Sequence, residues 1–223
     1  MKEEPIKRMK HHIIHRDSCF KDYSLSSNRN PEFLHTLLEE FEFMFASTIA
    51  SQHKTLYMRL DPRFPDHGFD LYHGDNEYFT DFLASFMKNL KRKGLKPRIF
   101  WVREKTLTAA NQHYHMVVLL DGNKTKSPYK HFLLAQRLWV SSLGIKDGKG
   151  LMNYSTWKIR GKKSPNSVML RKDDDQFFEK VNFCFESASY LCKTYSKNEC
   201  PKGVHMYGFS GIGDLKKLTN KKN

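Results

Sequence analysis

Alternating apolar and polar residues predict a β-strand over residues 54–60. Successive side chains of a strand point to opposite faces, so Leu56, Met58 and Leu60 are expected on one face and Tyr57 and Arg59 on the other. Segments rich in aromatic and β-branched residues predict further strands. These segments are residues 98–103, 113–120, 151–159 and 166–170.

Apolar residues that recur at helical spacing predict four helices, with the capping residues expected at their ends. The first runs from Asn30-Pro31 to about residue 50, and the second from Asp75 to Gly94. The third runs from Ser127-Pro128 to Gly144, and the fourth from the acidic cluster 173–175 to about Tyr195. From the first strand onward, the elements follow the order strand, helix, strand, strand, helix, strand, strand, helix. This order indicates an α+β fold of the ferredoxin-like kind, with helices packed on a central antiparallel sheet.

Three parts of the chain are expected. Residues 1–50 form an N-terminal extension, in which a mostly disordered or loosely attached tail precedes an amphipathic helix that packs on the main domain or on a partner. Residues 51–210 form the main domain, and residues 211–223 form a basic tail.

The charge is concentrated in the main domain and points to a polyanionic partner. The whole chain carries a formal charge of +14, with a pI of about 9.6. Residues 51–223 contain 31 Lys and Arg against 16 Asp and Glu, whereas residues 1–50 contain 7 against 8. The four cysteines form no CxxC pair, and no apolar run has the length of a membrane span or the character of a signal peptide. We therefore expect a cytoplasmic protein that binds nucleic acid and no membrane.

A His-x-His pair lies at the start of the strand predicted over residues 113–120. His113 and His115 share one face, and Tyr114 points away. Folding the two strands back over residues 105–112 brings Glu104 near both imidazoles. Two imidazoles and a carboxylate with open coordination positions predict a divalent-metal site. The alternative is that the histidines are half-buried strand residues with satisfied hydrogen bonds.

The last predicted helix carries two tyrosines with different expected roles. At about 100° per residue, Tyr190 falls nearly opposite the apolar stripe, with Lys193 nearly one turn further on. Tyr195 falls on the apolar side and is expected in core or helix-end packing. Tyr190 is therefore a candidate nucleophile, since a nearby cation and a metal can help a phenol to attack. The alternative is a solvated tyrosine near a lysine.

The motifs HYH at residues 113–115 and YLCK at residues 190–193 resemble those of the HUH endonucleases. The chain is most similar to the inovirus-type initiators of filamentous phages and their prophage relatives, with further similar stretches at MRLD (58–61) and WVRE (101–104). The resemblance covers roughly residues 51–210. It implies a ferredoxin-like HUH nickase domain over these residues, a Mg²⁺ or Mn²⁺ cofactor and a 5′-phosphotyrosine intermediate.

Carried over residue by residue, the resemblance implies a metal held by His113, His115 and Glu104, with Tyr190 as the nucleophile. Lys193 would assist at the phosphate or help to position the metal. The implied function is a rolling-circle DNA replication initiator. It nicks single-stranded DNA at a replication origin in the bacterial cytoplasm and leaves a free 3′-OH. Because the chain has no GxxxxGK[ST] motif, unwinding and synthesis are expected to need a host helicase and polymerase.

The basic domain is expected to hold the DNA strand through phosphate contacts and base stacking. The candidate DNA-binding residues are Arg59, Arg103, Tyr57, Trp101 and Trp157. Alternative functions are a single-tyrosine transposase or relaxase, a non-catalytic nucleic-acid-binding regulator, and a hydrolase that uses metal-bound water. Only the tyrosine mechanism leaves a covalent protein–DNA adduct.

Overall fold

A computed structural model describes residues 13–26, 32–65, 74–105, 111–154, 158–159, 162–163, 166–195, 197 and 200–213. The helices are α1 (His35–Ser51), α2 (Glu77–Arg92), α3 (Pro128–Ser142) and α4 (Phe177–Ser189), followed by a 3-10 turn at Tyr190–Cys192. The longer strands are β5 (Lys54–Pro62), β6 (Arg98–Glu104), β7 (His113–Asp121), β11 (Ser167–Arg171) and β12 (Tyr207–Ser210). The shorter strands are β1 (Ile14–His15), β2 (Cys19–Phe20), β3 (Tyr23–Ser24), β4 (Phe33–Leu34), β8 (Met152–Tyr154), β9 (Lys158–Ile159) and β10 (Lys162–Lys163).

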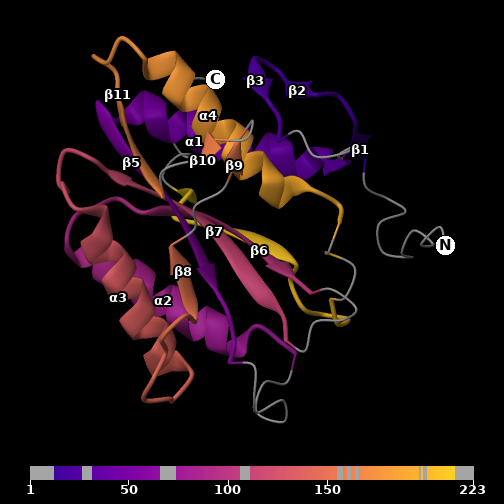
Figure 1. Ribbon diagram of the computed structural model, residues 1–223, viewed down its shortest axis with the longest axis vertical. Helices are drawn as coiled ribbons and strands as arrows, with labels where there is room; N and C mark the ends of the chain where they lie inside the picture. The colour runs from indigo at the N-terminus through magenta and orange to yellow at the C-terminus, as the bar shows by residue number, and fades with distance from the viewer. Residues whose placement is uncertain are drawn as a thin grey trace.

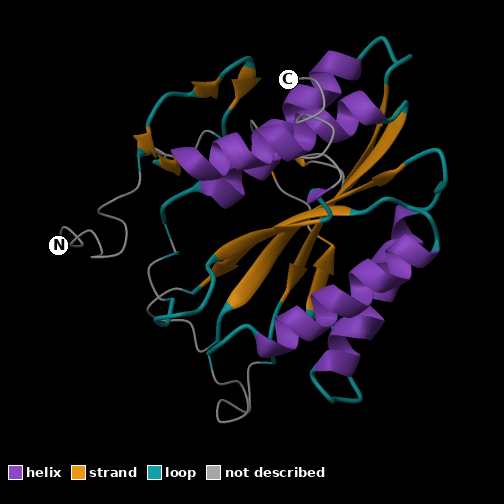
Figure 2. Cartoon of the chain, turned by 180° about the vertical axis from the view of Figure 1, so that it is seen from behind, coloured by secondary structure: helices purple, strands orange, loops and turns teal. Residues whose placement is uncertain are grey.

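A six-stranded antiparallel sheet lies at the centre of the molecule, with helices on both faces (Figures 1 and 2). Its strand order is β11-β5-β7-β6-β12, and β8 pairs with the far end of β5. The fold is therefore α+β, and the expectation of a central antiparallel sheet is confirmed. Among the described residues, no helix has both the length and the apolar character needed to cross a membrane.

Helices α2 and α3 cover the face of the sheet to which the even-numbered residues of β5 point. Phe79, Phe82 and Phe86 of α2 are fully or almost fully buried against this face, together with Trp139 of α3. Two helix boundaries agree with the sequence signals: Ser127 is the N-cap residue of α3, and Gly94 follows α2 with a φ of +68°. A glycine adopts this left-handed conformation without the strain of a Cβ. The N-cap residue of α2 is Asn76 instead of the predicted Asp75.

Helices α1 and α4 cover the opposite face. Phe41 and Phe45 of α1 and Phe185 of α4 pack with Tyr57 and Phe100 of the sheet, and all five are fully buried. Helix α1 therefore completes the core of the domain that contains the sheet. The alternative that its apolar face serves only a partner protein is wrong for this structure.

The N-terminal segment, residues 13–26 and 32–34, differs from the disordered or loosely attached tail that the sequence predicts. Residues 13–26 form short strands, and Phe20 and Leu25 are buried against α1 and α4, so this part is neither disordered nor loosely attached. Helix α1 begins at His35, because Phe33 and Leu34 pair with β1 instead. The predicted cap Asn30-Pro31 and residues 1–12 lie outside the described residues.

Three further differences lie after β7. Residues 207–210, predicted as a turn-rich segment, form the edge strand β12 along β6. Helix α4 ends at Ser189 instead of Tyr195, and Lys193 has an extended backbone conformation (φ −61°, ψ 148°). The strand predicted over residues 151–159 appears as β8 and β9, and residues 155–157 lie outside the described part of the chain.

Packing of α1 on the sheet is expected to dominate stability. Phe41→Ala should lower the free energy of unfolding by about 3–5 kcal/mol, because it removes a fully buried ring and leaves a cavity. The matched control is Phe178→Ala in α4, which removes a ring that is 83% exposed and should change stability by less than about 0.5 kcal/mol. Urea unfolding measures both, and equal effects would contradict this assignment of the core.

Candidate metal centre and neighbouring tyrosine

The antiparallel register of β6 and β7 brings three metal-ligating side chains together. Glu104 lies directly opposite His113, and Val102 lies opposite His115. All three ligand residues lie on the sheet face covered by α1 and α4, beyond the apolar residues Phe100 and Val102 of the same face. The sheet end therefore changes from apolar to polar where these side chains meet.

Glu104, His113 and His115, hereafter the metal group, have the spacing of a single-ion site. One ligand atom from each lies within 4.8 Å of the others. Glu104 Oε2 is 3.5 Å from His115 Nε2 and 3.9 Å from His113 Nε2. Two ligand atoms bound to one small divalent ion at about 2.1 Å can lie no more than about 4.2 Å apart, and both distances meet that limit. The donor set thus fits a divalent metal.

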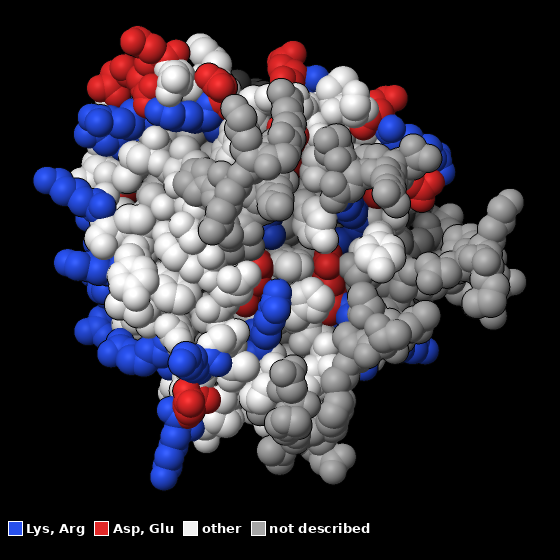
Figure 3. Space-filling model, viewed as in Figure 1, with Lys and Arg blue, Asp and Glu red and all other residues white. Residues whose placement is uncertain are grey.

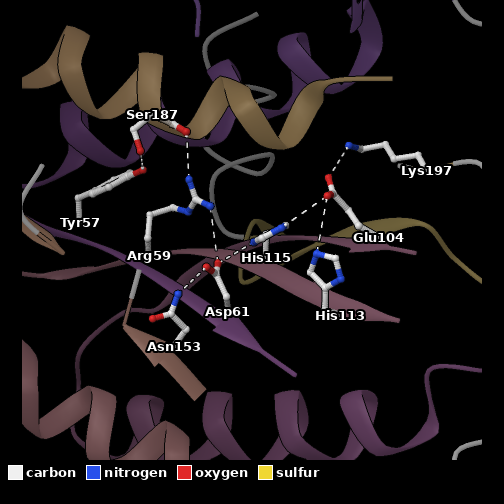
Figure 4. Close-up of polar contacts among 9 residues, drawn as sticks. All are labelled: Tyr57, Arg59, Asp61, Glu104, His113, His115, Asn153, Ser187 and Lys197. Carbon is white, nitrogen blue, oxygen red and sulfur yellow. Dashed lines mark hydrogen bonds and ion pairs between the residues drawn. The ribbon is translucent and has the colours of Figure 1, made fainter. Parts of the chain in front are cut away.

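A second carboxylate fixes the orientation of His115. Asp61 at the end of β5 accepts a hydrogen bond of 2.8 Å from His115 Nδ1, and this contact turns Nε2 toward Glu104 (Figure 4). Asp61 is itself held by Arg59 Nη2 at 3.6 Å and by the Asn153 side chain, which donates at 3.5 Å. A carboxylate behind a ligand histidine sets its tautomer and raises its basicity.

The two imidazoles have pKa values that move in opposite directions. Burial, and then the neighbouring His115, lower the pKa of His113 to about 4, so this ring is neutral at physiological pH. Burial also lowers the pKa of His115, but Asp61 and Glu104 outweigh burial and raise it above its ordinary value. His113 is therefore available to a metal without losing a proton, whereas His115 must release one at acidic pH.

Lys197 completes the polar network around Glu104. Its side chain is fully buried, and its Nζ donates to Glu104 Oε1 at 3.1 Å, on the carboxylate oxygen that does not face the imidazoles (Figure 4). This ion pair fixes the direction of the carboxylate. Sequence reasoning assigned no role to Asp61 or Lys197. The alternation of β5 was a usable signal for Asp61, because it places Asp61 on the same face as Tyr57 and Arg59.

Tyr190 lies beside the metal group, in the 3-10 turn that follows α4. Its ring centroid is 6.1 Å from that of His115, with the rings perpendicular. Lys193 Nζ lies over the Tyr190 ring, 4.3 Å from the centroid. Burial and then Glu104 raise the pKa of the Tyr190 hydroxyl, and burial lowers the pKa of Lys193 to about 8. The structure therefore brings Tyr190 and Lys193 to the same place as the metal group.

The N-terminal segment holds the turn that carries Tyr190. The Ser26 amide donates to Ser189 Oγ at 2.8 Å, and the Thr194 amide donates to the Glu32 carbonyl at 2.9 Å. Lys193 also forms an isolated antiparallel bridge with Phe33. Contacts on both sides of Tyr190–Cys192 thus come from residues that precede the first strand of the central sheet.

The predicted DNA-binding residues are mostly buried. Tyr57 is fully buried with its hydroxyl 3.1 Å from Ser187 Oγ, and the Trp101 ring packs between Phe79 and Gly208. Neither ring has a face open to a base, so the prediction that they are stacking platforms is corrected. Trp157 lies outside the described residues.

The two arginines and Tyr195 also differ from expectation. Arg59 is buried and donates to the Ser187 carbonyl at 3.1 Å, and Arg103 is buried and donates to the Gly74 carbonyl at 2.7 Å. Both support the protein framework, which corrects their placement on a DNA-contacting surface. Tyr195 is 67% exposed instead of packed in the core, because the helix ends before it.

Metal binding should require the metal group. Mn²⁺ is expected to raise the melting temperature of the wild-type protein, because an ion that binds only the folded state stabilises it by mass action. The double variant His113→Ala/His115→Ala should lose this shift, and His53→Ala, at an exposed position, should retain it. An unchanged shift in the double variant, measured by differential scanning fluorimetry, would place the metal elsewhere.

Mn²⁺ affinity should also depend on pH through His115. It should weaken as the pH falls through the raised pKa of His115, because a protonated Nε2 cannot ligate, whereas His113 stays neutral down to about pH 4. Asp61→Asn should weaken Mn²⁺ binding by about tenfold or more at pH 8 and move the acidic loss to lower pH. Calorimetric titrations between pH 5 and pH 8 measure both effects; an unshifted pH profile in the variant contradicts the role given to Asp61.

Comparison with known proteins places the chain in a family. No curated protein and no solved structure matches it significantly. Residues 15–210 match the family described as the YagK/YfjJ C-terminal domain, and the match begins in the N-terminal segment and ends at the last residue of β12. The matched segment therefore contains the whole described sheet, α1 to α4, the metal group and Tyr190, and the chain belongs to the YagK/YfjJ C-terminal domain family.

Proposed function

We propose that this protein is a metal-dependent endonuclease of the HUH type, which nicks single-stranded DNA with Tyr190 and initiates rolling-circle replication. One observation carries the proposal: the two-histidine, one-glutamate metal group lies beside a tyrosine ring, 6.1 Å from His115, with a lysine against that ring. A metal, a nucleophile and a cation together can support phosphodiester cleavage through a covalent intermediate.

The strand order supports this proposal. Taking β5, β6, β7 and β11 as four successive strands, their order in the sheet is fourth, first, third, second. β7 lies between β5 and β6, so the connection through α2 is a split βαβ unit, and α2 and α3 lie on the same face. This order agrees with the ferredoxin-like motif, which the resemblance to HUH endonucleases implies, and it therefore supports the proposal. α1, α4, β8, β12 and the N-terminal segment are additions to it.

The proposed reaction transfers a phosphoryl group from DNA to Tyr190. The hydroxyl oxygen of Tyr190 forms a bond to phosphorus while the bond from phosphorus to the 3′ oxygen breaks, which leaves a 5′-phosphotyrosine and a free 3′-OH. Lys193, whose pKa of about 8 leaves it largely charged at neutral pH, stabilises the negative charge that develops on the Tyr190 oxygen. The phenolic proton passes to water, and the departing 3′ oxygen takes a proton from water. A bound Mg²⁺ or Mn²⁺ supplies Lewis-acid polarisation of the phosphate.

The surrounding residues have defined tasks in this proposal. Asp61 and Lys197 orient His115 and Glu104, respectively, through contacts of 2.8 and 3.1 Å. The raised pKa of Tyr190 means that proton removal accompanies attack, since a free phenolate is scarce at neutral pH. A single-tyrosine transposase or relaxase would use the same chemistry. The replication role, the origin as substrate, the host helicase and polymerase as partners and the bacterial cytoplasm as location rest on the resemblance of the motifs.

The nucleophile can be identified with a pair of tyrosine variants. Tyr190→Phe should retain the fold and DNA binding but lose both nicking and the covalent adduct, because only the hydroxyl oxygen is removed. Tyr195→Phe is the matched control, since it makes the same change at an exposed ring, and it should retain both activities. The assay uses end-labelled single-stranded DNA from a candidate origin with Mn²⁺ and detects the adduct on a denaturing gel.

Peptide mapping of the adduct decides between the possible outcomes. DNA attached to a peptide that contains Tyr190 supports the proposal. An adduct on Tyr195, or one that persists in Tyr190→Phe, would overturn the choice of nucleophile. Metal-dependent cleavage without any adduct would favour a hydrolase that uses bound water.

A further inference from the structure

A basic hollow of about 370 Å³ lies between the end of α2 and the start of α3. We call it the lysine hollow; its lining residues are Lys93, Leu95, residues 124–127, Lys130 and His131. The lysine hollow lies beyond the last residue of β7, whereas the metal group lies at the start of that strand, at His113. The two are therefore on the order of 25 Å apart along the strand. Blue side chains line the margin of the molecule beside α2 and α3 (Figure 3).

Four lysines of the lining gather positive charge in one place. They are Lys93, Lys124, Lys126 and Lys130, and no acidic residue lines the hollow. Within the described part of the chain, none of the four forms an ion pair. A Cβ placed on Gly94 would lie 3.2 Å from Lys124 Nζ, so this ammonium group lies against the turn after α2. Such a concentration of cations attracts an anion of more than one charge.

The N-terminus of α3 adds uncharged donors to the same hollow. Ser127 is the N-cap residue but makes no side-chain capping hydrogen bond, and Pro128 follows it. The amide groups of the first turn therefore gain no partner from Ser127, and they carry the positive end of the helix dipole. Helix α3 has 15 residues, long enough for this dipole to be developed. By itself a helix N-terminus does not define a site.

His131 supplies an independent indication of a ligand. Its side chain is 5% exposed, and its Nε2 is 2.7 Å from Thr125 Oγ1. Its Nδ1 is buried and has no hydrogen-bond partner among the described residues. When the Thr125 hydroxyl donates to Nε2, the ring proton lies on Nδ1, which is then a donor without an acceptor. A buried donor of this kind costs free energy unless an acceptor reaches it.

We propose that the lysine hollow binds a phosphate group. A phosphate has the charge that four lysines attract, and its several acceptor oxygens can be shared by lysines, the first-turn amides of α3 and His131. The phosphate can belong to a nucleic-acid backbone or to a small phosphorylated molecule. This inference does not depend on the proposed nicking activity, because the hollow and the metal group lie at opposite ends of β7 and share no residue.

The first test uses inorganic phosphate and the wild-type protein, with the His131 ring as the local reporter in an NMR titration. Burial, followed by Lys93 and Lys130, lowers the pKa of His131, so a bound anion should raise that pKa and shift the ring signals saturably. Sodium chloride of equal ionic strength should not reproduce the shift. Unchanged His131 signals up to saturating phosphate and oligonucleotide would overturn the proposal.

The second test separates a built site from general attraction. Lys124→Gln/Lys130→Gln should weaken phosphate binding by at least tenfold. The matched control Lys146→Gln/Lys149→Gln removes the same charge from exposed positions outside the lining and should leave binding nearly unchanged. An equal loss in both double variants would show that net charge alone attracts the anion, and would overturn the assignment to this hollow.

The source of the phosphate is decided by a third titration, in Tyr190→Phe so that DNA stays intact. If a single-stranded oligonucleotide shifts the His131 signals at a lower concentration than inorganic phosphate, the hollow holds a backbone phosphate. If a nucleoside monophosphate or inorganic phosphate shifts them and the oligonucleotide does not, the ligand is a small phosphorylated molecule. Either result supports a phosphate site, and a failed nicking assay would affect neither.

Discussion

The antiparallel register of β5, β7 and β6 is the constraint on which the rest of the site depends. It places Glu104 opposite His113, and it brings Asp61 from the end of β5 to the back of His115. A shift of one residue in either pairing would send the ligand side chains to the opposite face, because strand side chains alternate. The apolar layers beneath α1 and α4 and beneath α2 and α3 fix this register, since both faces of the sheet are buried.

This arrangement requires several charged side chains to be buried away from water. Arg59, Asp61, His115, Glu104 and Lys197 form a connected series of charged and polar side chains, and all five are buried. Each group is tolerated away from water because its neighbour compensates for its lost hydration. Positive and negative members alternate along the series, so it positions the His115 imidazole and the Glu104 carboxylate without a large net charge of its own. A divalent cation would then add its charge at the partly open end, where His113 and Tyr190 are only partly buried.

The N-terminal segment packs against α4, the helix that leads to the site. Tyr23 stacks on Phe185 of α4 with ring centroids 4.0 Å apart, and Asn182 of α4 accepts a hydrogen bond from the Ser24 amide. These contacts join the start of the described chain to the helix that leads into Tyr190. The residues before the central sheet are thus part of the domain, in agreement with a family match that begins at residue 15.

Local sequence determined the features that depend on neighbouring residues alone. Strand alternation predicted the shared face of His113 and His115, and helical spacing with Gly94 and Gly144 predicted α2 and α3, because side-chain direction repeats every two or 3.6 residues. Features that depend on distant segments were decided by the tertiary structure. Helix α4 ends before Tyr195, where the Thr194 amide donates to the Glu32 carbonyl and Lys193 pairs with Phe33. Strand β12 joins the sheet by pairing with β6. The burial of Tyr57 and Trp101, and the ion pair between Lys197 and Glu104, likewise follow from what packs across from each side chain, which no local pattern encodes.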